Sequence, residues 1–194
     1  MRKAKIERKT KETEIELEIN LDGTGKNRIE TRIGFLNHML ELFSKHSLID
    51  FALKAKGDLE VDEHHLTEDI GICLGMALKK ALGEKKGIQR YGSAIIPMDE
   101  SLALCAVDFS DRGYPVINAE FERKIIGGFP TELIQDFFEA VALNAGMNLH
   151  IKVFYGRNTH HKIEAIFKAF ARAVKNAVEL DKRIQGVPST KGVL

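Results

Sequence analysis

The feature that most constrains this chain is a repeated pattern of two adjacent histidines with a glutamate three residues further on. The pattern occurs at residues 64–68 and again at residues 160–164. A single pair of neighbouring histidines can arise by chance, as a solvated or structural pair. Two copies with identical spacing in one chain point instead to an internal duplication, because self-similar segments mark repeated structural units.

The hydrophobic pattern supports the duplication, because each half shows strands, a helix, a strand and a helix in the same order. Alternating charged and apolar residues predict strands, and apolar residues at helical spacing predict helices. In the first half we expect a strand within 4–25, a helix over 27–46, a strand over 50–58 and a helix over 67–87. In the second half we expect strands over 100–111 and 114–126, a helix over 131–146, a strand over 147–156 and a helix over 160–180.

These elements predict an α+β fold with an internally duplicated unit, each half a mostly antiparallel four-stranded sheet backed by two helices. We expect the first repeat over residues 1–90, the second over 91–182, and a C-terminal tail over 183–194. No linker rich in proline or serine separates the repeats. The two repeats are therefore expected to pack as one body.

Composition excludes several classes of protein. The net charge of the 194 residues is +1, with 29 basic and 28 acidic residues, whereas a nucleic-acid binder shows a basic excess. No apolar run approaches the roughly 20 residues that span a bilayer, and the basic N-terminus lacks the apolar stretch of a secretory signal. Cys73 and Cys105 lie in apolar runs and are expected to be buried, reduced thiols. These features predict a cytoplasmic enzyme.

The spacing of the repeated motif has a geometric meaning at the start of a helix. Residues four apart share a helix face, so His64 lies above Glu68 while His65 points elsewhere. The second copy repeats this arrangement. Imidazole and carboxylate donors without a thiolate suit Mn, Fe, Zn, Ni or Co. One copy cannot complete a coordination shell, so the two halves or different subunits must converge on a two-site metal centre.

Other residues are candidates on weaker grounds. Aligning the two histidine pairs places His38 opposite Asp136. A phosphate site could be formed by Arg90, Arg112, Lys168 and the tail, because guanidinium, ammonium and hydroxyl groups are suitable donors. The alternative for the tail is a frayed terminus. Glu12 lies just before a predicted strand, and by residue type alone it would be a solvated surface charge.

Several segments together resemble the imidazoleglycerol-phosphate dehydratase family over essentially the whole chain. They are INLDGTG, FLNHML, DEHHLTEDIGICLG, NAGMNLHI, GRNTHHKIEAIFKAFARA and VPSTKGVL. The resemblance implies a lyase of L-histidine biosynthesis that dehydrates D-erythro-imidazole glycerol phosphate to imidazole acetol phosphate. It also implies two Mn²⁺ ions per active site, and a homo-oligomeric shell of 24 subunits built from trimers, with the sites at subunit interfaces.

The resemblance also assigns roles by matching position. It implies metal ligands at His38, His64, His65, Glu68, Asp136, His160, His161 and Glu164. It implies substrate contacts from Glu12, Arg90, Arg112, Lys168, Ser189 and Lys191, and catalytic roles for Glu12 and Glu164. Members of the family often have histidine where this chain has Asp136, and a polar residue where it has Leu42. Aspartate can still bind Mn²⁺.

The chemistry of the substrate explains why two metal ions would be needed. The proton to be removed is barely acidic, so simple base-induced elimination is slow. Metal ions on both ring nitrogens would hold the ring as imidazolate, which expels hydroxide to give a diazafulvene intermediate. Glu12 would then serve proton transfer, and Glu164 could shuttle protons as well as bind metal. The rival interpretations are a non-catalytic metal-binding shell and a metal-dependent phosphohydrolase.

Overall fold

The computed structural model describes residues 2–194. The chain begins with a hairpin of two antiparallel strands, β1 (Lys3–Lys9) and β2 (Thr13–Asn20). Sequence alternation alone suggested one strand here, but the chain reverses at Thr10. The Thr10 hydroxyl accepts hydrogen bonds from the backbone N–H groups of Glu12 and Thr13, at 3.1 and 2.9 Å. This turn reverses the chain, while charged and apolar residues alternate on both sides of it. The alternation alone therefore does not reveal the turn.

The first sheet has the strand order β1-β2-β4-β3, with β3 at Asn27–Glu30 and β4 at Asp50–Gly57. All neighbours are antiparallel except β3 and β4, which run parallel. The helix predicted from residue 27 begins only at α1 (Gly34–Ser47), because residues 27–30 pair with β4 instead. Arg32 lies between them with a φ of 66°, a left-handed conformation that ends the strand before the helix starts.

The second sheet repeats this topology with the order β5-β6-β10-β7. Its strands are β5 (Tyr91–Met98), β6 (Ser101–Asp108), β7 (Tyr114–Asn118) and β10 (Asn148–Tyr155). Again only the last pair, β7 and β10, is parallel. A small hairpin of β8 (Ile125–Ile126) and β9 (Phe129–Pro130) follows β7. The predicted α+β fold with an internally duplicated unit is thus confirmed.

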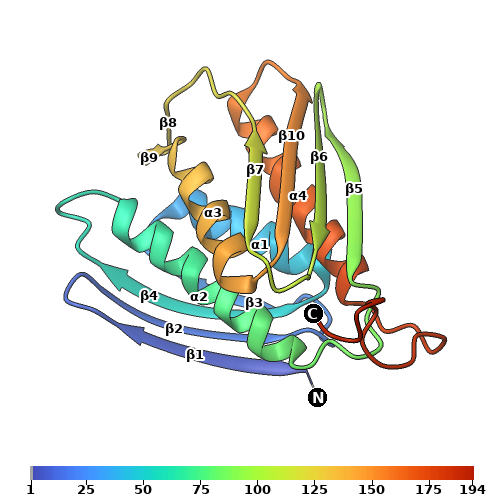
Figure 1. Cartoon of the computed structure of the whole chain (residues 1–194). Helices are drawn as coiled ribbons and strands as arrows, with labels where there is room; N and C mark the ends of the chain where they lie inside the picture. Colours follow the sequence, from blue (N-terminus) through green and yellow to red (C-terminus); the bar gives the residue numbers. More distant parts are fainter. Residues whose placement is uncertain (1) are drawn as a thin grey trace.

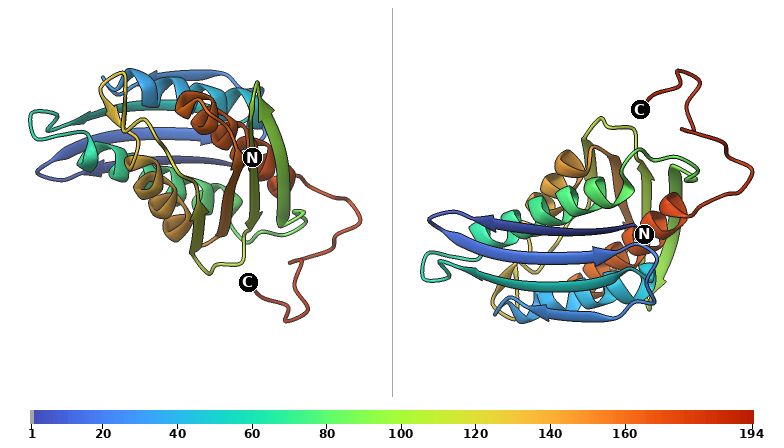
Figure 2. Two further views of the ribbon diagram at one scale, coloured as in Figure 1. Left: turned by 90° about the horizontal axis from the view of Figure 1, so that it is seen from above. Right: turned by 90° about the horizontal axis from the view of Figure 1, so that it is seen from below.

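The four helices lie between the two sheets, which turn their other faces outward (Figures 1 and 2). Besides α1 they are α2 (His64–Leu82), α3 (Leu133–Ala145) and α4 (Thr159–Val178). Helix α2 packs on β1 and β2, and α4 packs on β5 and β6. The helices also pair across the halves, α2 with α3 and α1 with α4. The apolar faces of the two repeats therefore form one shared core.

Two sequence expectations about chemistry outside the site can be checked against the fold. Cys73 and Cys105 are buried, unpaired thiols, and burial raises the pKa of the Cys73 thiol to about 12. Neither is therefore a reactive thiolate near neutral pH. Among residues 2–194, the helices are too short or too polar for any of them to cross a bilayer.

The contact between α2 and α3 depends on two glycines of α2. A Cβ added to Gly71 would lie 2.7 Å from the carbonyl oxygen of Phe137, and one added to Gly75 would lie 2.6 Å from that of Val141. Both distances are shorter than van der Waals contact, and both oxygens belong to the backbone of α3. The two helices can approach this closely only because no side chain separates them.

We expect Gly71→Ala and Gly75→Ala to destabilise the protein, although alanine favours a helix by about 1 kcal/mol over glycine. Forcing the helices apart typically costs about 1–3 kcal/mol, and each kcal/mol corresponds to roughly 2–4 °C in Tm at this chain length. Thermal unfolding followed by circular dichroism measures the effect. Gly34→Ala is the matched control, since an added Cβ there meets nothing within 4 Å. Equal Tm values for all three variants would contradict this account of the packing.

Candidate metal centre

The first cluster of candidate ligands joins both halves of the chain. His38 comes from α1, whereas His160 and Glu164 come from the first turns of α4. One ligand atom from each of the three lies within 4.8 Å of the others. The Nε2 atoms of His38 and His160 lie 3.8 and 3.4 Å from the same Glu164 oxygen, Oε2. The packing of α1 on α4 thus brings together three of the residues named from the sequence.

The start of α4 is held in place by local interactions. The side chain of Asn158 caps the helix by accepting a hydrogen bond from the His160 backbone N–H at 2.9 Å. The His160 ring also packs edge-on against Phe35, with ring centroids 5.2 Å apart. These contacts limit the orientations available to the imidazole.

Glu164 is largely buried and remains a carboxylate. Burial opposes its ionisation, but Lys168 one turn later pairs with it at 2.6 Å, and the net effect lowers the pKa of Glu164. Lys168, predicted as a substrate contact, therefore lies directly beside the cluster. A hollow of about 340 Å³ opens next to these residues and is also lined by Met98, Arg123 and Asn158.

A second cluster stands at the repeat-related position. His64 and Glu68 come from α2, and Asp136 comes from the first turn of α3. His64 Nε2 lies 3.6 Å from Glu68, and His64 Nδ1 lies 3.9 Å from Asp136. The two carboxylates approach different nitrogens of the ring, so the three donors do not face a single point. The side chains are partly exposed, which leaves room for the ring to turn.

The first cluster passes a simple test of fit for a metal ion. Two donor atoms each about 2.1 Å from one ion lie roughly 3–4 Å apart in tetrahedral or octahedral coordination, and the distances to Glu164 fall in that range. Two imidazoles and one carboxylate supply only three donors. Further ligands must come from elsewhere, which is the arrangement of an open site.

The second histidine of each pair turns away from its cluster and meets a carboxylate. His65 Nδ1 lies 3.0 Å from Asp58, in the loop after β4. His161 Nδ1 lies 2.7 Å from Glu100, in the turn between β5 and β6. The hydrogen bond that His65 donates to Asp58 raises the pKa of His65, and the one that Glu100 accepts from His161 holds the pKa of Glu100 at about 2. In the arrangement described, neither histidine joins the cluster of its neighbour.

Glu12 lies at the tip of the hairpin between β1 and β2, near the start of α2. Its carbonyl oxygen accepts a hydrogen bond from the Asp58 backbone N–H at 3.1 Å, and both residues line a hollow of about 330 Å³. The hairpin is tied to α2 by buried Asp69, which accepts hydrogen bonds from Arg8 at 2.8 Å and from the Thr13 hydroxyl. Glu12 is exposed, and within residues 2–194 nothing hydrogen-bonds its carboxylate.

The remaining predicted phosphate donors lie at the other end of the second sheet. Arg90 precedes β5 and forms an ion pair with Asp108 at 2.7 Å, while its Nη1 donates to the Pro188 carbonyl at 2.9 Å. This contact holds the tail, in which Ser189 Oγ accepts from the Lys191 backbone N–H at 3.2 Å. Arg112 follows β6 at the same end, where its carbonyl accepts from Asn148. Figure 2 shows the tail running along the outside of the body.

The two groups of predicted site residues are therefore far apart within one chain. Strand β5 leads from Arg90 to Met98, and eight strand residues span about 23 Å. His160 and His161 lie at the Met98 end. Of the predicted phosphate donors, only Lys168 lies beside candidate metal ligands.

Sequence reasoning missed the carboxylates that hold the second histidines. Asp58 precedes His65 by seven residues, and Glu100 precedes His161 by 61. Neither spacing corresponds to a local motif. The nearby acids Asp62 and Asp99 offer equal sequence signals, yet Asp62 accepts from the His64 backbone N–H, and Asp99 lies 3.8 Å from His161 Nε2. Only the fold distinguishes these acids.

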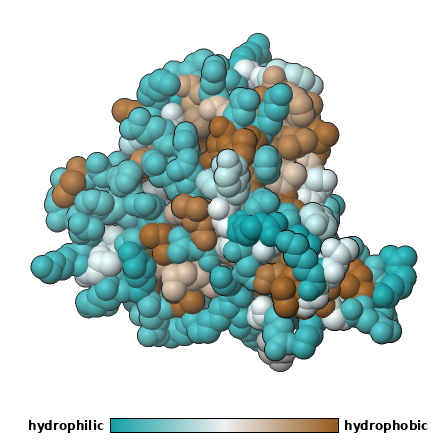
Figure 3. Space-filling view, in the orientation of Figure 1, coloured by the Kyte–Doolittle hydropathy of each residue, from teal (hydrophilic) through white to brown (hydrophobic). Residues whose placement is uncertain are grey.

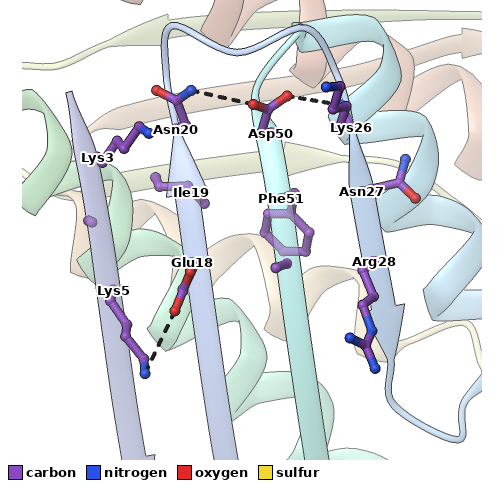
Figure 4. A pocket seen from close by; sticks show the side chains of 12 residues that line it. Lys3, Lys5, Glu18, Ile19, Asn20, Lys26, Asn27, Arg28, Asp50 and Phe51 are labelled. Atoms are coloured by element: carbon purple, nitrogen blue, oxygen red, sulfur yellow. Dashed lines mark hydrogen bonds and ion pairs between the residues drawn. The ribbon is translucent and has the colours of Figure 1, made fainter. Parts of the chain in front are cut away.

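A different hollow, of about 550 Å³, lies far from these ligands on the outer face of the first sheet (Figure 4). Its charged side chains are already engaged: Lys5 pairs with Glu18 at 3.7 Å, and the Asp50 carboxylate accepts a hydrogen bond from the Lys26 backbone N–H at 3.0 Å. No histidine lines it. It has the character of a solvated, charged sheet surface rather than a reaction site.

Comparison with known proteins identifies relatives over the whole chain. The sequence model of a family described as imidazoleglycerol-phosphate dehydratase matches residues 31–174. The imidazoleglycerol-phosphate dehydratase of Acetivibrio thermocellus is 58% identical over 193 residues, covering 100% of this chain and 99% of the relative. That of Listeria welshimeri is 57% identical over 194 residues, covering both chains fully.

Solved structures show the same fold. The crystal structure of imidazoleglycerol-phosphate dehydratase from Staphylococcus aureus superposes with a TM-score of 0.84 at 43% identity, covering 92% of this chain and 99% of that one. The enzyme from Pyrococcus furiosus, in complex with (S)-C348, superposes with a TM-score of 0.85 at 39% identity, covering 97% and 100%. The duplicated fold, the paired histidine motifs and these full-length similarities show that the chain belongs to the imidazoleglycerol-phosphate dehydratase family, the metal-dependent enzymes of histidine biosynthesis.

Proposed function

We propose that this chain dehydrates imidazole glycerol phosphate at an active site that several copies of the chain build together around two Mn²⁺ ions. The observation that supports the proposal is the distance between the two groups of predicted site residues within one chain. The cluster of His38, His160 and Glu164 supplies three donors and is incomplete, and the donors around His64 do not face a single point. Arg90, Arg112 and the tail lie at the other end of β5, a strand about 23 Å long. A substrate small enough to touch both groups requires that they come from different chains.

The side chains have distinct tasks in this proposal. The clusters on α1–α4 and α2–α3 hold the ions against the imidazole ring, while Arg90, Ser189 and Lys191 bind the phosphate. When bound, Mn²⁺ supplies the electrostatic stabilisation that keeps the ring as imidazolate and favours loss of hydroxide through a diazafulvene. We assign the proton transfer to Glu12, whose carboxylate is exposed and has no hydrogen-bond partner among residues 2–194. Lys168 keeps Glu164 ionised and available as a ligand.

The rival functions fit the chain less well. A metal-storage shell has no use for the arginine pair and the tail. A phosphohydrolase would use a hydroxide bridging two ions to attack phosphorus, whereas the family dehydrates its substrate. The buried, reduced cysteines accord with a cytoplasmic location, where disulfides are rare.

The products of one reaction distinguish the three functions. Purified protein incubated with Mn²⁺ and imidazole glycerol phosphate should form an enolisable ketone, detected by its absorbance in alkali, without release of inorganic phosphate. Chelator-treated protein is the control and should be inactive until Mn²⁺ is restored. Free phosphate as the product would support the hydrolase, and turnover of neither kind would support storage.

The outer face of the second sheet supports assembly. Side chains that point away from α4 include Ile95, Leu104, Val116 and Phe154, and Ile95 is 56% exposed. In Figure 3 hydrophobic residues gather on the upper right, over the strands of this sheet. The outer face of the first sheet instead carries alternating lysines and glutamates. An apolar sheet face of this kind is typical of an interface, and we assign it to a second copy, within trimers of a 24-subunit shell.

We expect Ile95→Asp to reduce the particle to smaller species, because a charge would be buried in the proposed interface. Ala52→Asp makes the same kind of change on the outer face of the first sheet and should leave the mass unchanged. Size-exclusion chromatography with light scattering measures both.

Chelation of the unchanged protein should also shift the particle toward trimers, since in this proposal the ions join ligands from different chains. A constant mass after verified metal removal would count against shared sites.

Glu12→Gln separates chemistry from binding. Loss of the proton carrier should lower kcat by about 10²- to 10⁴-fold, while Mn²⁺ content and particle mass stay unchanged because Glu12 lies outside both clusters. Glu60→Gln is the matched control, as it removes a carboxylate lining the same hollow. A kcat within a few-fold of the parent would make Glu12 a solvated surface charge. Loss of metal instead would place it among the ligands.

A further inference from the structure

We propose that Asp58 and Glu100 are positioning residues for the second histidine of each pair. Each carboxylate holds Nδ1 of the imidazole, so that the opposite nitrogen, Nε2, is presented to a metal ion. The inference rests on the proposed function only in that it requires a metal. It assigns roles to two residues that belong to neither histidine motif.

In the first half the contact is simple. The two oxygens of Asp58 lie 3.0 and 3.3 Å from His65 Nδ1. An ionised carboxylate has no proton to donate, so in the neutral imidazole Nδ1 carries the hydrogen and Nε2 keeps its lone pair. Within residues 2–194, the Asp58 carboxylate has no other hydrogen-bond partner. The Asp58 side chain therefore positions the His65 ring and does not bind other groups of its own loop.

In the second half the carboxylate that holds the histidine comes from the turn between β5 and β6. Glu100 Oε2 lies 2.7 Å from His161 Nδ1. Its other oxygen, Oε1, accepts hydrogen bonds from the backbone N–H groups of Arg157 and Asn158, at 3.2 and 2.8 Å. One carboxylate thus fixes both the imidazole and the loop that leads into α4. Asp99 is 3.8 Å from Nε2, beyond hydrogen-bond distance, so this nitrogen stays free for a ligand role.

The recurrence is informative because the two carboxylates are not equivalent by duplication. Glu100 immediately precedes β6, and Glu12 immediately precedes β2, so these two are the repeat-related pair. Asp58 instead follows β4. In each half a carboxylate therefore binds Nδ1 of the second histidine of the pair, although the two carboxylates come from positions that the duplication does not relate. The recurrence indicates that the site requires this contact. A carboxylate on the far nitrogen of a metal-binding histidine fixes the tautomer and strengthens the ligand.

Because the two halves use different carboxylates, Glu12 and its repeat counterpart Glu100 have different surroundings. In the second half the glutamate before the second strand is occupied by His161. In the first half Asp58 binds the corresponding histidine, and the Glu12 carboxylate has no hydrogen-bond partner among residues 2–194. At the same hairpin position, Glu100 thus orients an imidazole in the second repeat, whereas Glu12 remains available for proton transfer in the first.

Metal binding to the chelator-treated protein tests the proposal without measuring turnover. Mn²⁺ is titrated into the parent, Asp58→Ala and Glu100→Ala, and free ion is followed by its electron paramagnetic resonance signal. We expect the dissociation constant to rise about 10- to 100-fold in both variants, the usual effect of removing such a partner, with the number of sites unchanged at saturation. Asp58→Asn keeps an oxygen that accepts the Nδ1 hydrogen and should lose less affinity. In Glu100→Gln the single amide oxygen stays with the loop N–H groups and the NH2 group faces Nδ1, so this variant should lose affinity as Glu100→Ala does.

Asp62→Asn and Asp99→Asn are matched controls, because they remove an equal charge from the same loops without touching Nδ1. Their Mn²⁺ affinity should stay within about twofold of the parent. If Glu100→Ala does not fold, Glu100→Gln decides, since it retains the loop contacts. Parent-like affinity in the variants at both positions would overturn the inference while leaving the proposed function intact. A parent that binds no Mn²⁺ would overturn both.

Discussion

The packing of helices across the two repeats is the constraint on which the rest of the structure depends. Each sheet covers only one face of its helices, so neither repeat could bury its apolar surface alone. The close contact of α2 with α3, permitted by Gly71 and Gly75, and that of α1 with α4 close the core. The same contacts build the ligand clusters. His38 meets Glu164, and His64 meets Asp136, only because helices of different repeats lie side by side.

The duplication preserved topology while letting the chemistry of the two halves diverge. Both sheets keep the same strand order and directions. The clusters differ, since aspartate in one stands where histidine stands in the other, and Glu164 is buried beside a lysine whereas Glu68 is exposed. The two repeats also recruit different carboxylates to their second histidines. Such differences make the two candidate ligand clusters unlike each other although they come from equivalent positions of the two repeats.

The position of the predicted phosphate donors gives the proposed assembly a physical purpose. Arg90 and the tail meet at one end of β5, and the ligands of α4 lie at the other. No rearrangement short of unfolding would bring them together in one chain, because β5 is an ordered strand of the second sheet. Bringing another copy alongside joins them without distortion. In the proposed assembly, the apolar outer face of that sheet, around Ile95, would exclude water from the contact that completes the site.

The sequence by itself determined the family and the duplicated α+β architecture, and it named the candidate metal ligands, because these depend on periodicity and on motifs within a few residues. It misplaced the start of α1, since residues 27–30 fit a strand as well as a helix until β4 lies beside them. Only the tertiary structure decided that Asp58 and Glu100, rather than Asp62 and Asp99, hold the histidines. It alone also showed that the phosphate donors lie far from the clusters. Both depend on contacts between segments distant in sequence, which local pattern does not encode.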